Sequence, residues 1–236
     1  MKFRILVLAL LVPAAACSGP SAARHWTQGD ALAQKGDKNG AILEYREAIR
    51  LKPAFPALHD KLGIALDDNG DLDGATAEFR EAVRLKPEDS SLHFNLANAL
   101  LKKGEADRAI AEYRESIRLK PSAEAHYNLG IALGRKGDLD SALAAYREAL
   151  RLRPNDSSTH YNLANMLKKK NDVDGAIAEY REAVRLEPSS AKFHYCLGRA
   201  LAQKADRNGA ITEFRTAFML DPQYESHVKN GQTVPE

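Results

Sequence analysis

A repeat of about 34 residues runs through most of the chain and constrains its fold more than any other feature. Consecutive segments begin at residues 22, 56, 90, 123, 157 and 191, and they align with at most one residue gained or lost. Each segment is too short to bury an apolar face alone, so neighbouring segments must stack to share a core. The spacing therefore predicts an extended array of similar units.

Each unit carries two amphipathic helical patterns separated by a turn. Apolar side chains recur near 3.6-residue spacing around unit positions 7, 8 and 11, and again around positions 20, 24, 27 and 28. Position 20 is always alanine, and a proline at position 32 ends the second helix. The turns of the first four units contain a glycine, which suits a left-handed conformation. The fifth unit has Asn171, which also suits it, and the sixth has Ala205, which adopts it only at a cost.

These positions resemble the tetratricopeptide repeat over residues 22–224. The resemblance implies an all-α fold, a right-handed α-solenoid of six tetratricopeptide repeats built from antiparallel helix pairs. The first helices would line a concave groove and the second helices would face outward. The repeats are expected at residues 22–55, 56–89, 90–122, 123–156, 157–190 and 191–224, followed by a short capping helix and tail at 225–236.

The N-terminus has the pattern of an export signal. Lys2 and Arg4 precede an apolar run over residues 5–12, which is too short to cross a bilayer. The following "AAAC" resembles a bacterial lipobox, which implies removal of residues 1–16, lipidation of Cys17 and a tether over residues 17–21. Ser18 resembles the outer-membrane sorting pattern. The alternative is ordinary cleavage, which leaves a soluble periplasmic protein.

Histidine stands at position 4 of all six units. Equivalent side chains on successive helices lie roughly 8 to 10 Å apart, whereas a shared zinc needs nitrogens about 2.0 to 2.1 Å away. We therefore expect no metal site, but packing of each imidazole near the aromatic residue at position 24, with a pH effect where the histidines become charged while partly buried. The six residues are His25, His59, His93, His126, His160 and His194.

Other signs of catalysis or nucleic-acid binding are weak. The sequence has no Walker loop, dinucleotide fingerprint or His-Glu-x-x-His motif. Ser189 and Lys192 match Ser-x-x-Lys without its companion motifs. Beyond Lys2 and Arg4 the basic and acidic residues balance at 32 each, which argues against nucleic acid as a partner. The sequence predicts a protein without catalytic residues or cofactors.

The free face of the first helices repeats an aromatic and an amide side chain in register. The asparagines at position 6 resemble the asparagine ladder in the superhelical domain of O-linked N-acetylglucosamine transferase, where amides bind a peptide backbone; a side-chain amide both donates and accepts. The alternative is that asparagine is simply common at this position. The predicted peptide-binding residues are Phe94, Asn95, Asn98, Tyr127, Asn128, Tyr161, Asn162, Asn165 and Tyr195.

Basic residues follow one edge of this face. They would favour acidic peptide segments through charge-assisted hydrogen bonds, or they form a solvated edge. The lysine that the carboxylate clamp of chaperone-binding repeats requires at position 5 is absent. The basic residues are Lys102, Lys103, Arg135, Lys136, Lys168, Lys169 and Lys170.

The last repeat departs from the others at its outer end. Met219 replaces an arginine, and Phe218 replaces a smaller aliphatic residue. The substitutions predict an interface there for a partner or a second copy of the chain. The alternative is that Tyr224 and Val228 fold back over this end.

Together these features predict a non-catalytic protein-protein interaction scaffold in the bacterial cell envelope. It would bind extended peptides in its groove and face the periplasm from the outer membrane. The combination resembles assembly and adaptor lipoproteins such as type IV pilotins. The alternative is a soluble periplasmic binding subunit of a larger envelope enzyme or complex.

Overall fold

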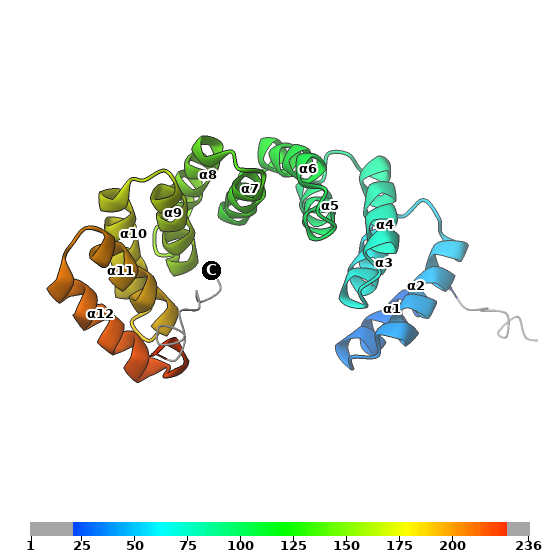
Figure 1. Ribbon diagram of the computed structural model, residues 1–236. Helices are drawn as coiled ribbons and strands as arrows, with labels where there is room; N and C mark the ends of the chain where they lie inside the picture. The colour runs from blue at the N-terminus through cyan, green and yellow to red at the C-terminus, as the bar shows by residue number, and fades with distance from the viewer. Residues whose placement is uncertain (1–20, 226–236) are drawn as a thin grey trace, which may run out of the picture. The chain divides into compact units, whose positions relative to one another are not determined.

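The computed structural model describes residues 21–225, and its regular elements in that range are all helices (Figure 1). They form consecutive antiparallel pairs, each consisting of a first and a second helix. The helices are α1 (Ala22–Gln34), α2 (Lys38–Leu51), α3 (Pro56–Asp68), α4 (Leu72–Leu85), α5 (Ser90–Lys102), α6 (Ala106–Leu119), α7 (Ala123–Lys136), α8 (Leu139–Leu152), α9 (Ser157–Lys169), α10 (Val173–Leu186), α11 (Ala191–Gln203) and α12 (Arg207–Leu220).

Local start signals place the helices. Ser122 and Asp156 lie just before α7 and α9, and their side chains accept hydrogen bonds from backbone N–H groups of the first turn. Helix α3 begins instead with Pro56, whose fixed φ suits the first helical position. Asp138 and Asp172 cap the second helices α8 and α10 in the same way.

The turn within every pair contains one residue in the left-handed conformation. Glycine occupies it in the first four pairs, for example Gly137 with φ 85°. Asn171 and Ala205 adopt the same conformation with φ 63° and 64°. For alanine this conformation costs roughly 1 to 2 kcal/mol, so the packing of α11 on α12 imposes it on Ala205.

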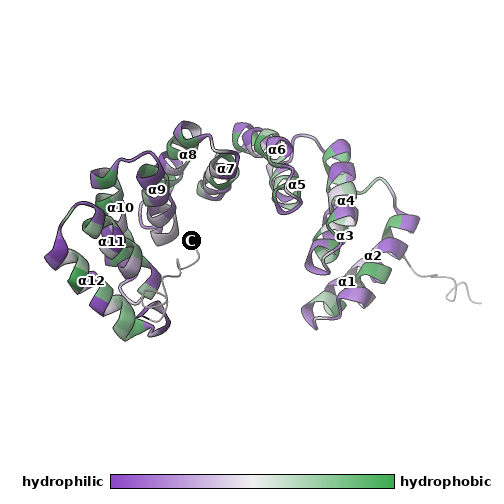
Figure 2. Ribbon diagram, in the orientation of Figure 1, coloured by the Kyte–Doolittle hydropathy of each residue, from purple (hydrophilic) through white to green (hydrophobic). Residues whose placement is uncertain are grey.

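A small residue in each first helix lies against a ring from its partner helix. A Cβ added to Gly130 would lie 2.7 Å from the Tyr146 ring. In the α9–α10 pair the equivalent positions hold Ala164 and Tyr180, and both residues are fully buried. The close approach of the two helices therefore depends on a small residue opposite a large one. Figure 2 shows apolar and polar residues alternating along the helices.

The helices form two compact units. The first contains α1 to α4, and the second contains α5 to α12. Within the second unit each pair packs on the next, and α5, α7, α9 and α11 lie along one side (Figure 1). All nine predicted peptide-binding residues belong to these four helices.

Candidate functional site

Hydrogen bonds connect the predicted peptide-binding residues from one repeat to the next. The Asn128 Nδ2 group donates to Asn98 Oδ1 at 3.0 Å, which joins α7 to α5. Asn162 Nδ2 donates to the Tyr127 hydroxyl at 2.9 Å, which joins α9 to α7. We call Asn98, Tyr127, Asn128 and Asn162 the amide row. These bonds hold the side chains in fixed orientations.

The amide row keeps hydrogen-bonding groups for a ligand. An amide has two N–H donors and an oxygen with two lone pairs, and Asn128 and Asn162 each use one donor within the described residues. Burial raises the pKa of Tyr127, so its hydroxyl stays protonated at neutral pH. Because that hydroxyl accepts from Asn162, its own proton is available to donate.

Two asparagines of the predicted set have a structural role. The Tyr113 hydroxyl donates to Asn98 Oδ1 at 2.6 Å, and the Tyr180 hydroxyl donates to Asn165 Oδ1 at 2.5 Å. Each bond joins the two helices of one repeat. Asn165 is only 8% exposed, so its carbonyl oxygen mainly satisfies the buried tyrosine.

The aromatic residues of the predicted set differ in exposure. Each packs against the ring at position 24 of its own repeat, as Tyr127 does on Tyr146 with centroids 6.0 Å apart. Phe94 and Tyr127 are partly exposed, whereas Tyr161 and Tyr195 are buried. Tyr195 is also covered by Tyr224, whose ring lies 5.1 Å away. Phe94 and Tyr127 thus offer more aromatic surface to a ligand.

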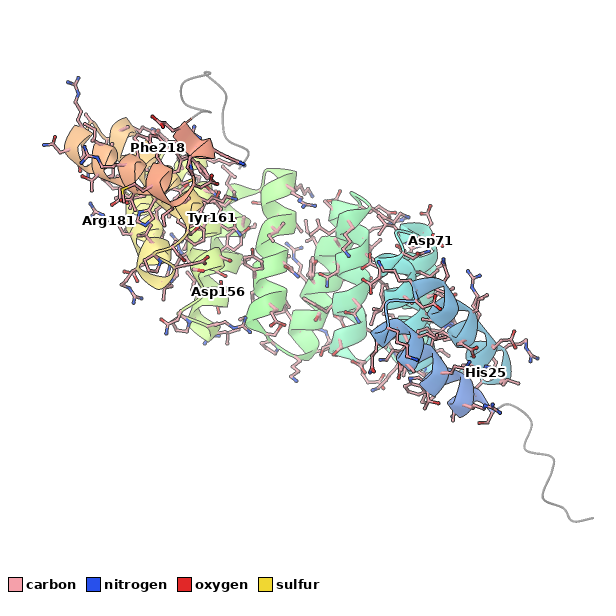
Figure 3. The ribbon with its side chains drawn as sticks, turned by 90° about the horizontal axis from the view of Figure 1, so that it is seen from below. His25, Asp71, Asp156, Tyr161, Arg181 and Phe218 are labelled. Atoms are coloured by element: carbon pink, nitrogen blue, oxygen red, sulfur yellow. The ribbon has the colours of Figure 1, made fainter. Side chains whose placement is uncertain are left out.

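An open cleft of about 340 Å³ lies beside the amide row, between α7, α9 and α11. We call it the cationic cleft. Tyr161 forms part of its wall and stacks on Phe193 of α11 at 5.1 Å. Figure 3 labels Tyr161 among the helices of this unit. The polar and aromatic residues of the cleft used below are Arg135, Tyr161, Asn162, Asn165, Lys169 and Lys192.

The histidines make a contact that the sequence analysis missed. The Nδ1 atoms of His25, His59, His93, His160 and His194 lie 2.6 to 2.7 Å from a glutamate oxygen at position 23, one residue before the expected aromatic. In the last four of these, Nε2 lies 2.7 to 3.0 Å from the carbonyl oxygen of the proline before the repeat. A carboxylate and a carbonyl both accept, so only the doubly protonated imidazolium donates to both.

His126 is the exception. Ala145 stands at position 23 of its repeat in place of glutamate. Burial lowers the pKa of His126, and the more distant Glu148 only partly opposes this effect. The fourth repeat therefore provides an internal comparison for the other five.

The predicted interface at the last repeat lies on α12. Phe218 stacks on Phe214 with centroids 6.1 Å apart, and Met219 is 78% exposed. Ile211 is 56% exposed, whereas the equivalent Ile177 is 5% exposed beneath α11. Tyr224 covers Tyr195 and leaves Ile211 and Met219 exposed. Val228, the other residue of the fold-back alternative, lies outside the described residues.

Other predictions concern metal sites, membrane-spanning helices and the N-terminal segment. Among residues 21–225, no group of three or more histidine, cysteine or acidic side chains is arranged to hold a metal ion. No helix in that range has the length and apolar character needed to cross a bilayer. Cys17 and the expected signal peptide lie outside the described residues.

Sequence comparison connects these repeats to known families. Models described as tetratricopeptide repeat match residues 61–124, 123–156 and 145–178, and one described as TPR repeat matches 29–70 and 164–204. Together they span residues 29–204. No curated protein sequence matches the chain.

Solved structures share the fold. PilF of Pseudomonas aeruginosa is 19% identical with a TM-score of 0.73, over 89% of this chain and 97% of that one. YrrB, described as a TPR protein with an unusual peptide-binding site, is 20% identical with a TM-score of 0.67, over 79% and 97%. MamA of Desulfovibrio magneticus is 22% identical with a TM-score of 0.67, over 71% and 96%. At these identities the similarity concerns the fold.

Proposed function

The chain belongs to the tetratricopeptide repeat family, and from this premise we propose that it is a non-catalytic scaffold that binds an extended peptide segment of a protein partner. The amide row is the observation that carries the proposal. Its side chains are held by bonds between repeats and retain donors and acceptors for a ligand. A peptide backbone presents the same two kinds of group.

Spacing supports this mode of binding. Adjacent packed helices lie roughly 8 to 10 Å apart, and an extended chain advances about 3.3 Å per residue. Successive rungs of the amide row would therefore meet a peptide about every third residue. Because amides contact the main chain, affinity from the row would depend little on the peptide side chains, and selectivity must come from neighbouring residues.

The chemistry of the described residues favours binding over catalysis. Cys196 is the free cysteine in this range, and it is buried. Burial raises the pKa of its thiol, against smaller opposing effects of the Tyr161 hydroxyl and nearby cations. A thiol in such surroundings is a poor nucleophile.

Replacing Asn128 and Asn162 together by alanine is expected to weaken peptide binding by about 1 to 3 kcal/mol for each lost contact, because peptide groups already removed from water would lose their partners. Suitable peptides come from a random twelve-residue display library selected on the full chain, and fluorescence anisotropy then measures their affinity. Some stability will also be lost with the bonds to Asn98 and Tyr127, so binding is measured well below the unfolding temperature.

The matched control replaces Asn39 and Asn69 by alanine. Their side-chain amides also pair across neighbouring repeats, but they belong to the first unit, whereas the amide row belongs to the second. The control should bind the selected peptides like the parent chain. Equal affinities for parent, control and Asn128/Asn162 variant would rule out the amide row as the binding site.

We further propose that the scaffold works in the bacterial cell envelope as an assembly or adaptor lipoprotein anchored through Cys17. The export pattern at residues 1–17 supports this location. Ile211, Phe218 and Met219 would give it a second contact surface, for another protein or a second copy. The second candidate is a soluble periplasmic subunit of a larger complex, which the alternative cleavage in the same segment favours.

Cys17→Ala is expected to move the protein from the membrane fraction to the soluble fraction, because the acyl chains provide the membrane affinity. Immunoblotting of fractionated cells measures the distribution. Cys196→Ala is the control. Cys196 is buried in the array, so its replacement should leave the distribution between membrane and soluble fractions unchanged. Recovery of Cys17→Ala in the membrane at the parent level would exclude the lipid anchor and favour a different attachment.

A further inference from the structure

The cationic cleft carries positive charge without a matching negative charge on its walls. Arg135, Lys169 and Lys192 line it from three different helices, and its lining includes no aspartate or glutamate. Lys168, Lys192 and Arg199 lie close enough to lower the pKa of the Cys196 thiol, although burial has the larger, opposite effect. The positive field therefore extends over α9 and α11.

Several cations elsewhere in the second unit are paired with carboxylates. Lys136 lies 2.5 Å from Asp107, and Lys170 and Lys204 pair with Asp140 and Asp174 on the preceding second helices. Arg118, Arg151 and Arg185 on the second helices each pair with a glutamate three residues earlier. Lys169 and Lys192 have no such carboxylate partner among the described residues, so their charges remain available to a ligand.

The cleft also has a defined shape and polarity. The Lys192 ammonium lies 4.5 Å from the centre of the Tyr161 ring, which fixes it over an aromatic surface. Arg135 donates one guanidinium N–H to the Leu101 carbonyl at 3.4 Å, which leaves other N–H groups for a second acceptor. Asn162 belongs both to the cleft and to the amide row. A peptide lying on the row would thus pass the cleft.

We propose that the cationic cleft is a specificity subsite for an acidic side chain, aspartate or glutamate, of the bound peptide. The proposal rests on the peptide-binding function proposed above and adds the selectivity that backbone contacts lack. A carboxylate would accept charge-assisted hydrogen bonds from Arg135, Lys169 and Lys192, while Tyr161 contacts the aliphatic part of the side chain. The residues come from α7, α9 and α11, so three packed repeats are needed to form the subsite.

The probes are three fluorescein-labelled decapeptides with alternating Ala-Glu, Ala-Gln or Ala-Lys sequences. We expect the Ala-Glu peptide to bind the full chain most tightly, with an affinity that falls as salt is added. Lys169→Gln with Lys192→Gln is expected to weaken its binding by about tenfold or more, because two charged hydrogen bonds are lost. The Ala-Gln affinity should change by less than about twofold.

The matched control is Lys170→Gln with Lys204→Gln, which removes the same net charge from lysines already paired at the repeat edge. It should bind the Ala-Glu peptide within about threefold of the parent, because only the long-range field changes. Equal losses in both double variants would overturn the proposal, since binding would then follow net charge alone.

Two further sets of results would overturn the acidic-side-chain subsite. No preference for Ala-Glu over Ala-Gln, or no binding of Ala-Glu, would overturn the subsite. Competition by inorganic phosphate at low millimolar concentration, combined with display-selected peptides that lack acidic residues, would also overturn it in favour of a free-anion site. Display-selected peptides that bind through Asn128 and Asn162 would leave the scaffold function intact in each case, so the two failures are distinguishable.

Discussion

Tyr180→Ala is expected to reduce the free energy of unfolding of the second unit by about 3 to 5 kcal/mol, the usual cost of deleting a buried aromatic side chain. The Tyr180 side chain is fully buried. Its ring packs on Tyr161 with centroids 5.9 Å apart, and Ala164 of the partner helix is also fully buried. Alanine cannot fill this space, and the gap between α9 and α10 is bounded by packed helices on both sides.

The deletion also removes the hydroxyl that donates to Asn165. Tyr180→Phe separates the two effects, because it keeps the ring and leaves the Asn165 oxygen without this donor. An unsatisfied buried acceptor costs about 1 to 3 kcal/mol, so the phenylalanine variant should lie between the parent and the alanine variant. Urea unfolding followed by circular dichroism at 222 nm measures all three.

The position of Tyr180 within the array adds a second expectation. Stability in a stack of repeats is a sum of repeat and neighbour contributions, and the α9–α10 pair lies inside the second unit. Weakening that pair should therefore separate the unfolding of α11 and α12 from that of α5 to α8, which broadens or splits the transition. Met219→Ala is the control, since a 78% exposed side chain should change stability by less than about 0.5 kcal/mol. If the Tyr180→Ala variant proved as stable as that control, the packing described for Tyr180 would be contradicted.

The sequence predicted the helices well because their determinants are local. Turn glycines, capping serines and aspartates, and the terminal prolines recur at fixed unit positions, and each acts within a few residues of itself. The first helices accordingly begin at Ala22, Pro56, Ser90, Ala123, Ser157 and Ala191. The family was predicted from the same positions, and the all-helical, paired architecture is confirmed.

The contacts of the candidate site depend on geometry that repeat spacing does not contain. The sequence placed Asn98 and Asn165 on the free face of the first helices, yet both accept from a tyrosine of their own second helix. The position-23 glutamates stand next to an apolar stripe, where charged residues normally face solvent. The actual rotation of the second helices brings these glutamates to the histidines.

The cationic cleft was only partly foreseen for a similar reason. Arg135 and Lys169 belong to the basic edge that the sequence analysis identified. Lys192 was not expected in the groove, because the same unit position holds alanine, serine or glutamate in the other repeats. Only the packing of α11 beside α9 brings Lys192 over the Tyr161 ring. In this chain, a residue that departs from the repeat pattern contributes to the cleft as much as the residues that follow it.

The histidine contacts predict a pH dependence with a definite sign. The hydrogen bond to Glu179 raises the pKa of His160, burial opposes this, and the Pro154 carbonyl and the Glu179 and Glu182 charges add to the increase. A group whose pKa is higher in the folded state stabilises that state below its unfolded pKa, and the stabilisation is lost as pH rises through the folded value. The array should therefore be more stable near pH 6 than near pH 8.5 as far as His160 contributes.

Glu179→Gln is expected to lower the unfolding free energy near pH 6 by about 1 to 2 kcal/mol, because the imidazolium loses its charged acceptor while solvent at the 28% exposed carboxylate limits the effect. The variant should also lower the pKa of His160, which NMR of the imidazole carbons measures directly. Glu182→Gln is the control, because Glu182 pairs with exposed Arg185 and only adds to the field at His160. An unchanged His160 titration in Glu179→Gln would contradict the proposed imidazolium.

The fourth repeat allows the reverse experiment. His126 has its pKa lowered by burial and lacks a position-23 carboxylate, so its protonation opposes folding and stability is lost as pH falls. Ala145→Glu places a carboxylate where the other five repeats have one, and we expect the pKa of His126 to rise toward the behaviour of His160. Ala145→Gln has a similar shape without the charge and should leave His126 titrating at low pH. If both variants shift the His126 titration equally, side-chain size and not charge governs these histidines, and the pH dependence must have another origin.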